Sequence, residues 1–351
     1  MSGGVDSSVA AALLSAEGHE VVGATMKLWG GPSDSGCCSV ADVLDARRVA
    51  DRLGIDHHTF DLTEPFAEAV VDRYVAEHAA GRTPNPCVEC NRHLKFRRFL
   101  DRARRLGFDA VATGHHARIR TDAEGRARLH RGADARKDQS YVLAVLGAGD
   151  LADARLPIGE RTKAEVRALA ARLGLATADK AESQEVCFIA RRGVGAGRAA
   201  FLAERMPLHP GTLVDARTDE PLGTVPAVEL VTVGQRRGLG LAAVGDDGER
   251  RYALQVDVVA RRVVVGSEAD LATDVWPLEE LRFLHEPLPA GAPVLAQASA
   301  HGRAQPALLE DGAVRLERPA RRVAPGQLIA LYVGDEVVAS ATAAGVAVGG
   351  R

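Results

Sequence analysis

The chain has 351 residues, 46% of them hydrophobic, and a formal net charge of −3. Its length favours two or three domains, and its charge excludes a uniformly basic surface, so any RNA contact must be a local patch. The sequence has no run of about 18 apolar residues and no signal-peptide pattern, which predicts a cytoplasmic protein with no membrane partner. Five cysteines, an odd number, argue against a disulfide framework and for thiol chemistry or a metal site.

Residues 2–8, Ser-Gly-Gly-Val-Asp-Ser-Ser, run into a helical pattern with apolar Val9, Ala10, Leu13 and Leu14. Adjacent glycines let backbone N–H groups point inward, the serines add donors, and the helix adds its positive dipole end, which together predict a phosphate cradle. A Walker loop would need a lysine directly after its second glycine. The motif instead resembles the pyrophosphate loop of the ATP-pyrophosphatase superfamily, whose members cleave ATP between the α- and β-phosphates to adenylate a substrate oxygen.

Helical and β-prone runs alternate from about residue 7 to 190, which predicts a doubly wound α/β domain with a parallel sheet. We expect strands at 20–26, 57–60 and 110–113, and helices at 39–53, 64–79, 89–106 and from the Thr162 capping box to Gly174. For the helix at 39–53, Ser39 is the expected N-cap, Gly54 the expected stop, and Val40, Val43, Leu44, Ala50 and Leu53 the expected buried face.

Short alternating strands with frequent Gly and Pro replace this pattern after about residue 192, for example at 228–233, 252–259 and 262–266. We therefore predict three domains. These are an α/β catalytic domain at 1–192, a central β-rich domain at 193–266 and a C-terminal β-barrel-like domain at 267–351.

Four further segments fall where the α/β pattern places loops facing the cradle. The first, Gly-Arg-Thr-Pro-Asn-Pro-Cys-Val-Glu-Cys-Asn at 81–91, has two stiffening prolines, and its Cys90 is expected in the first turn of the next helix, where the dipole lowers the pKa of a thiol. The second, at 112–115, is a strand end whose Gly114 permits close approach of a nucleotide. The third is the polar segment 136–141, and the fourth, 182–189, carries Cys187 in a β-prone run.

In this order, and followed by Gly-Gln-Arg-Arg-Gly-Leu-Gly at 234–240, the motifs resemble the MnmA-type tRNA 2-thiouridylase family over most of the chain. The resemblance implies ATP-dependent 2-thiolation of the wobble uridine of tRNA: adenylation of the 2-oxygen, attack by a cysteine persulfide, and release as a disulfide with AMP and pyrophosphate. It implies ATP and Mg²⁺ as cofactors, and tRNA and a persulfide sulfur donor or relay protein as partners.

The same resemblance assigns residues to roles. Cys187 is implied as the persulfide carrier and Cys90 as its disulfide partner. The implied ATP-site residues are Ser2, Gly3, Gly4, Val5, Asp6, Ser7, Met26 and Gly114. The implied tRNA-binding residues are Asn85, Pro86, Cys87, Lys137, Asp138 and Gln139.

A basic cluster lies between residues 92 and 105, where one acid, Asp101, stands against Arg92, Lys95, Arg97, Arg98, Arg102, Arg104 and Arg105. Such a cluster beside the proposed active loop predicts contact with the phosphate backbone of RNA. The aromatic content of 4% does not favour stacking on several splayed bases.

The chain departs from the family pattern in three places. Members normally have a buried strand before the Ser-Gly-Gly turn, whereas this chain starts at Met1, so we expect the natural start to lie upstream. Cys87 stands where many relatives carry an acid. Residues 300–303, Ala-His-Gly-Arg, stand where some relatives have an arginine–aromatic pair, so no site is assigned there.

Other interpretations stay open. Cys87, Cys90 and Cys187 could hold an iron–sulfur cluster with one open iron carrying sulfide, a route we do not favour. Zinc is disfavoured because only one CxxC pair exists, so no metal ligands are assigned, and Cys37 and Cys38 are left without a role. A pyrophosphate-loop synthetase for a small metabolite would need neither the cysteines nor the basic helix, and an RNA-binding module would not need the cradle.

Overall fold

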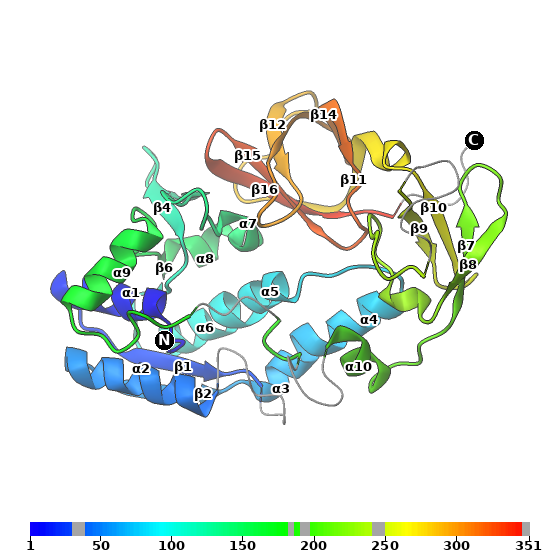
Figure 1. Ribbon diagram of the computed structural model, residues 1–351. Helices are drawn as coiled ribbons and strands as arrows, with labels where there is room; N and C mark the ends of the chain where they lie inside the picture. The colour runs from blue at the N-terminus through cyan, green and yellow to red at the C-terminus, as the bar shows by residue number, and fades with distance from the viewer. Residues whose placement is uncertain (30–38, 182–185, 190–196, 241–249, 346–351) are drawn as a thin grey trace. The chain divides into compact units, whose positions relative to one another are not determined.

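The computed structural model describes residues 1–29, 39–181, 186–189, 197–240 and 250–345 (Figure 1). The chain groups into two compact units. The first comprises Met1–Val71, Pro86–Arg198 and Asp335–Val337, and the second Asp72–Asn85, Ala199–Gly334 and Val338–Arg351. The stretch Asp72–Asn85, expected inside the first domain, thus groups with the second unit, and the domain boundaries at 192 and 266 stay predictions. No helix in the described ranges is long and apolar enough to cross a membrane.

The first unit is an α/β assembly, as the alternating pattern predicted. Two parallel strand pairs, β1 with β2 and β3 with β6, are surrounded by helices. The helices and strands of this unit are α1 (Val5–Ala16), β1 (Gly23–Lys27), α2 (Val40–Leu53), β2 (His57–Asp61), α3 (Thr63–Phe66), the π-helix η1 (Ala67–Asp72), α5 (Pro86–Glu89), the π-helix η2 (Cys90–Arg98), α6 (Phe99–Arg105), β3 (Val111–Ala112), β4 (Ala117–Thr121), β5 (Ala127–Arg131), α7 (Ser140–Leu143), α8 (Ala148–Ala152), β6 (Ala154–Arg155) and α9 (Lys163–Arg172).

Local chemistry sets several helix ends. The Ser39 side chain accepts a hydrogen bond from the Asp42 N–H at 3.2 Å and caps α2, which ends at Gly54 with φ 67°, and Thr162 forms the expected capping box with Glu165. The predicted buried face of α2 was partly wrong. Small Ala46 and Val49 are buried with Ala50, whereas Val40 is 74% exposed and Leu44 is also exposed. Val49 packs in one hydrophobic cluster with Val5 and Val9 of α1.

The second unit is rich in β structure and ends in a barrel. A four-stranded sheet has the order β8-β7-β10-β9, and six further strands in the order β11-β14-β13-β12-β15-β16 close through a β11–β16 pairing (Figure 1). Its elements are α4 (Arg73–Ala79), α10 (Arg198–Ala203), β7 (Gly211–Asp215), β8 (Pro221–Val225), the 3₁₀ helix η3 (Val228–Leu230), β9 (Tyr252–Asp257), β10 (Arg262–Gly266), the 3₁₀ helix η4 (Ala269–Leu271), β11 (Ala272–Phe283), β12 (Pro293–Gln297), β13 (Gln305–Glu310), β14 (Ala313–Arg321), β15 (Leu328–Val333) and β16 (Glu336–Ala343). The expected β-rich parts and terminal barrel are therefore confirmed.

The predicted strand at 228–233 was wrong, because this segment begins with the 3₁₀ turn η3. Val228 and Val231, three residues apart, are both buried in the core of the four-stranded sheet. That spacing matches the three residues per turn of a 3₁₀ helix, so the apolar residues reach one face without forming a strand.

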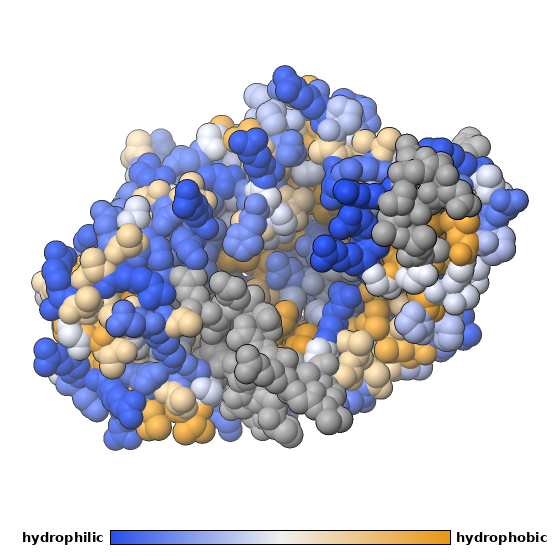
Figure 2. Space-filling model, in the orientation of Figure 1, coloured by the Kyte–Doolittle hydropathy of each residue, from blue (hydrophilic) through white to orange (hydrophobic). Residues whose placement is uncertain are grey.

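Hydrophilic residues cover most of the face shown in Figure 2, and hydrophobic ones form smaller patches.

An aromatic cluster anchors the turn that carries Cys187. The Phe188 ring lies 6.0 Å from the Trp29 ring and 5.7 Å from the Phe66 ring, centroid to centroid, and Phe188 and Phe66 are fully buried. The backbone at Val186–Ile189 forms a turn, with the Ile189 N–H donating to the Val186 carbonyl at 3.2 Å, so the expected β-strand around Cys187 was wrong. The turn allows the Phe188 side chain to pack between the Trp29 and Phe66 rings, and this packing fixes residues 186–189.

We predict that Phe188→Ala lowers the free energy of unfolding of the first unit by about 3–5 kcal/mol, because a fully buried aromatic ring leaves a cavity. Trp276, the second of the two tryptophans, belongs to the barrel, so the measurement is urea unfolding followed by Trp29 fluorescence in a Trp276→Phe background. Phe188→Leu should lose less. A loss below about 1 kcal/mol for the alanine variant would contradict the anchoring role.

Candidate active site

The first turn of α1 offers backbone N–H groups to an anion. Gly4 is the N-cap, and among the described residues no side chain caps this end. The Ser2 N–H donates to the Ser7 hydroxyl at 3.0 Å, and the two serine hydroxyl oxygens lie 3.2 Å apart. Gly3 has φ 67°, and a Cβ there would lie 2.3 Å from the Asp42 carbonyl oxygen. An open helix end with ordered hydroxyls suits phosphate oxygens, so these residues fit the triphosphate of ATP.

Gly114 brings the end of β3 against this turn. A Cβ on Gly114 would lie 2.5 Å from both the Asp6 carbonyl carbon and the Ser7 nitrogen. Gly114 therefore contacts the loop backbone directly, and the structure brings together the residues predicted at 3–7 and 114. Met26, another predicted ATP-site residue, is partly buried on β1, where the neighbouring Ala24 carbonyl accepts a hydrogen bond from the Met1 amino group.

Asp6 is the electrostatic centre of the loop. Lys163 Nζ donates to the two carboxylate oxygens at 2.7 and 2.8 Å, and His116 Nε2 lies 3.3 Å from Oδ1. Burial by itself would raise the pKa of Asp6, but the hydrogen bonds from His116 and Lys163 outweigh it and lower the pKa. Asp6 is therefore ionised at neutral pH.

Both partners of Asp6 were missed by the sequence analysis, although weak signals existed. Lys163 is the first residue of α9, directly after the capping Thr162, and is 8% exposed. His116 follows Gly114 by two residues at the strand end already singled out. His115, between Gly114 and His116 in the sequence, is buried, and its Nδ1 lies 2.7 Å from the Thr113 hydroxyl oxygen. Burial lowers the pKa of His115 to about 3, so its imidazole is neutral.

The cysteines occupy two segments of the first unit. The helix begins at Pro86, so exposed Cys87 lies in its first turn, and Cys90, which is 7% exposed, begins the π-helix η2. The expectation that Cys90 occupies the first turn was wrong, because proline suits the first helical position and starts the helix earlier. Cys187 is partly buried in its turn. Cys37, Cys38 and residues 182–185 lie outside the described residues.

The described ranges contain no group of three or more His, Cys, Asp or Glu side chains placed to hold a metal ion.

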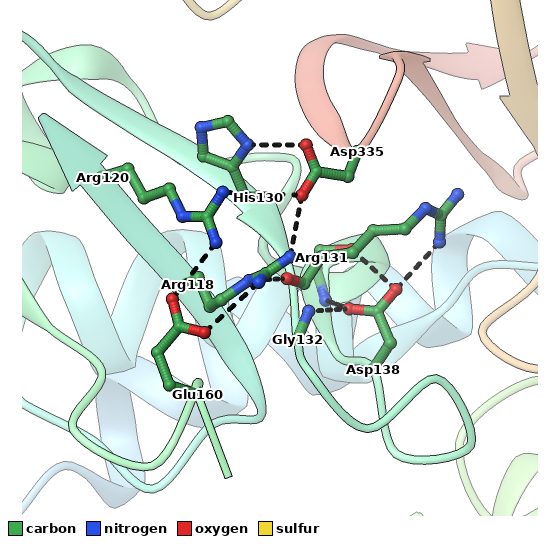
Figure 3. Close-up of polar contacts among 9 residues, drawn as sticks. Arg118, Arg120, His130, Arg131, Gly132, Asp138, Glu160 and Asp335 are labelled. Carbon is green, nitrogen blue, oxygen red and sulfur yellow. Dashed lines mark hydrogen bonds and ion pairs between the residues drawn. The ribbon is translucent and has the colours of Figure 1, made fainter. Parts of the chain in front are cut away.

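Asp138, in the predicted contact segment 137–139, binds groups of its own domain (Figure 3). The Asp138 carboxylate accepts hydrogen bonds from Arg131 Nη1 at 2.8 Å, the Gly132 N–H at 3.0 Å, and the N–H and hydroxyl of Ser140 at 3.0 and 2.9 Å. Gln139 Oε1 accepts from the His116 N–H at 2.9 Å. Asp138 and Gln139 thus order the loop beside His116, and contact of this segment with tRNA stays a prediction.

The β4–β5 hairpin that follows His116 carries an ion-pair network (Figure 3). Arg118 lies 3.2 Å from Glu160 and 2.7 Å from Asp335, and His130 Nδ1 lies 3.1 Å from the same Asp335 carboxylate. Arg120 also reaches Glu160 at 3.3 Å. Because β4 begins one residue after His116, the network steadies the strand that leads out of the site.

The basic cluster on η2 and α6 is not uniformly charged. Arg104 lies 2.6 Å from Asp153, and Arg98 lies 3.7 Å from Glu68, whereas in the part of the chain that the structure describes Arg97 has no acidic side chain within ion-pair distance. Arg102 stacks over the Phe60 ring at 4.6 Å. A pocket of about 510 Å³ is lined by Leu62, His93, Arg97, Arg98, Asp101, Arg102 and Arg105. Its excess of cationic groups over one acid suits an anionic ligand.

Comparisons with known proteins cover nearly the whole chain. Residues 1–191 match the family model described as the tRNA methyl transferase HUP domain, 199–267 the tRNA methyl transferase PRC-barrel domain, and 295–343 the aminomethyltransferase beta-barrel domain. The chain is 46% identical over 355 residues to the tRNA-specific 2-thiouridylase MnmA of Acidothermus cellulolyticus, covering 98% of this chain and 96% of that protein. It is 47% identical over 359 residues to the protein of the same name from Kineococcus radiotolerans, covering 98% and 97%.

Among solved structures, NMN synthetase from Francisella tularensis is similar over 52% of this chain and 63% of that chain, with 23% identity and a TM-score of 0.34. A likeness this distant carries no information on function.

We predict that Gly114→Ala weakens ATP binding by about 1–3 kcal/mol, because the added methyl group would meet backbone atoms that cannot move aside. Equilibrium dialysis with labelled ATP measures the effect. Gly149→Ala is the matched control, since a Cβ there meets nothing within 4 Å. Equal affinities for the two variants would show that the close approach at Gly114 is not needed.

Proposed function

Because the chain belongs to the family of MnmA tRNA-specific 2-thiouridylases, we propose that it uses ATP to replace the 2-oxygen of the wobble uridine of tRNA with sulfur. The chain is accordingly a sulfurtransferase that acts on tRNA. The observation that carries the proposal is the match over 98% of the chain to proteins of that name. The first turn of α1 has no side-chain cap, and close backbone packing at Gly3 and Gly114 holds it in place. Both features support the use of ATP.

The first chemical step in this proposal activates the uridine. An amide-like carbonyl oxygen is a poor leaving group, so its conversion to an adenylate precedes sulfur attack. The N–H groups of the first α1 turn and the Lys163 ammonium are suited to the charge of the departing pyrophosphate. Asp6 offers the hard oxygen ligands that Mg²⁺ prefers, and Mg²⁺ bound there would neutralise phosphate charge.

The second step transfers sulfur from a persulfide on Cys187. The terminal sulfur attacks C2 of the uridine, the C2–O bond breaks, and AMP leaves. The Cys90 thiolate then attacks Cys187 Sγ, which forms the Cys90–Cys187 disulfide and leaves the sulfur on C2. An external thiol must reduce the disulfide, and a persulfide donor or relay protein must reload Cys187. The Phe188 anchor supports this role, because it orders the turn bearing the carrier.

The tRNA contacts follow the distribution of charge. The arginines that line the pocket on η2 and α6 are assigned to the phosphate backbone; they are Arg97, Arg98, Arg102 and Arg105. Asn85, Pro86 and Cys87 are proposed to meet the target base. Lys137, Asp138 and Gln139, all partly exposed, form the second proposed contact segment.

We expect labelled sulfur to pass from a persulfide donor to purified tRNA in the presence of ATP and Mg²⁺, with anaerobically prepared protein whose iron content is measured. Cys187→Ser should keep tRNA-dependent ATP–pyrophosphate exchange and lose sulfur transfer, because activation does not use this thiol. Transfer by the serine variant would contradict the persulfide role. Transfer by wild-type protein that requires iron would instead favour a cluster on Cys87, Cys90 and Cys187.

We also expect the double variant Arg97→Ala/Arg98→Ala to bind tRNA more weakly and with a smaller salt dependence. Each lost phosphate contact should reduce the slope of log K against log salt by about 0.7–0.9, because fewer counterions are released. Arg104→Ala is the matched control, since its guanidinium is already paired with Asp153. Filter binding over a salt series measures the slopes, and an unchanged slope for the double variant would refute the assignment.

A further inference from the structure

The loop directly before Asn85 is held within the second unit by hydrogen bonds to the backbone of Thr83. The Thr83 N–H donates to the Pro325 carbonyl at 2.7 Å, and the Gln327 side-chain amide donates to the Thr83 carbonyl. The Thr83 hydroxyl also lies 3.4 Å from the Thr232 hydroxyl. Both polar groups of the Thr83 backbone are therefore bound by the β14–β15 loop, more than 240 residues away in sequence.

Arg82 adds a charged contact to this loop. Its Nε donates to Glu77 Oε2 at 2.6 Å, and its Nη2 donates to Glu279 of β11. The Arg82 side chain is 24% exposed. A planar guanidinium shared between two partly buried carboxylates holds its side chain more rigidly than a lysine would.

Two glycines, Gly326 and Gly81, allow the loop at 81–83 to pack closely against its neighbours. Gly326 has φ 88°, and a Cβ there would lie 3.2 Å from both the Arg82 Cβ and the Thr83 nitrogen. Gly81 has φ 72°, and a Cβ there would lie 3.0 Å from a methyl carbon of Val258. We call Glu77, Arg82, Thr83, Glu279, Pro325 and Gln327 the loop clamp.

We propose that the loop clamp, through Arg82, positions the Asn85-Pro86-Cys87 segment for reaction with the uridine, an inference that rests on the proposed function. The chain passes from Thr83 to Asn85 through Pro84, and Pro86 follows, so two fixed φ angles transmit the placement of Thr83 to the segment. Arg82 itself contacts two carboxylates and is a positioning residue. A reacting group displaced by about 1 Å can lose up to about 100-fold in rate.

The test compares Arg82→Ala with Arg315→Ala. Arg315 is a matched control, because it lies in the barrel that carries Glu279 and also pairs with two carboxylates, Glu310 at 2.6 Å and Asp274 at 3.3 Å. We expect Arg82→Ala to lower kcat for tRNA thiolation by about 10- to 100-fold. The KM for tRNA should stay within about twofold, because phosphate contacts dominate affinity. Arg315→Ala should keep the wild-type kcat.

A charge exchange separates positioning from stability. Arg82→Glu alone places three carboxylates together and should lose activity, whereas adding Glu279→Arg restores an ion pair and should recover most of the lost kcat. Gln327→Ala, which removes the hydrogen bond to the Thr83 carbonyl, should lower kcat in the same way. This variant replaces Arg82→Ala as the test if Arg82→Ala does not fold.

The inference is overturned by an unchanged kcat in Arg82→Ala, or in Gln327→Ala where the arginine variant does not fold. A folded but inactive exchange variant also overturns it. A wild-type chain that does not thiolate tRNA overturns the proposed function and this inference with it, whereas wild-type activity beside unaffected clamp variants overturns the inference alone.

Discussion

Close backbone contact at glycines is the constraint on which the rest of the site depends. The first turn of α1 is packed between α2, at Gly3, and the end of β3, at Gly114, in positions where a Cβ would lie only 2.3 and 2.5 Å from backbone atoms. This packing places Asp6 where Lys163 and His116 can reach it. The chain after His116 is then ordered by Gln139 and by the β4–β5 hairpin.

The parts of the structure that local chemistry determines could be predicted from the sequence. Ser39, Gly54 and Thr162 end or begin helices as expected, because caps and left-handed glycines act within a few residues. The α/β class of the first part of the chain and the β-rich character of the rest followed from the periodicity of apolar residues. The turn at residues 2–8 and the helix after it could also be predicted, because the glycines, serines and apolar helical residues are contiguous in the sequence.

The remaining features depend on contacts that are distant in sequence. The pairing of Asp6 with Lys163 joins residues 157 positions apart, and no pattern in either segment specifies the other. The turn at Cys187 was taken for a strand, because only the burial of Phe188 against Trp29 and Phe66 shows why the backbone turns there. Charge was similarly overestimated, since a sequence counts arginines but does not show that Arg104 is paired with Asp153.

The grouping of Asp72–Asn85 with the second unit has a consequence for folding during synthesis. Arg82 is 197 residues from Glu279, and Thr83 is 244 residues from Gln327, so this stretch leaves the ribosome long before its partners exist. Contacts of such long range form late, because loop closure costs entropy before the contacts stabilise the chain. The α/β unit therefore has an interruption, between Val71 and Pro86, that reaches its final place only after the barrel strands have been made.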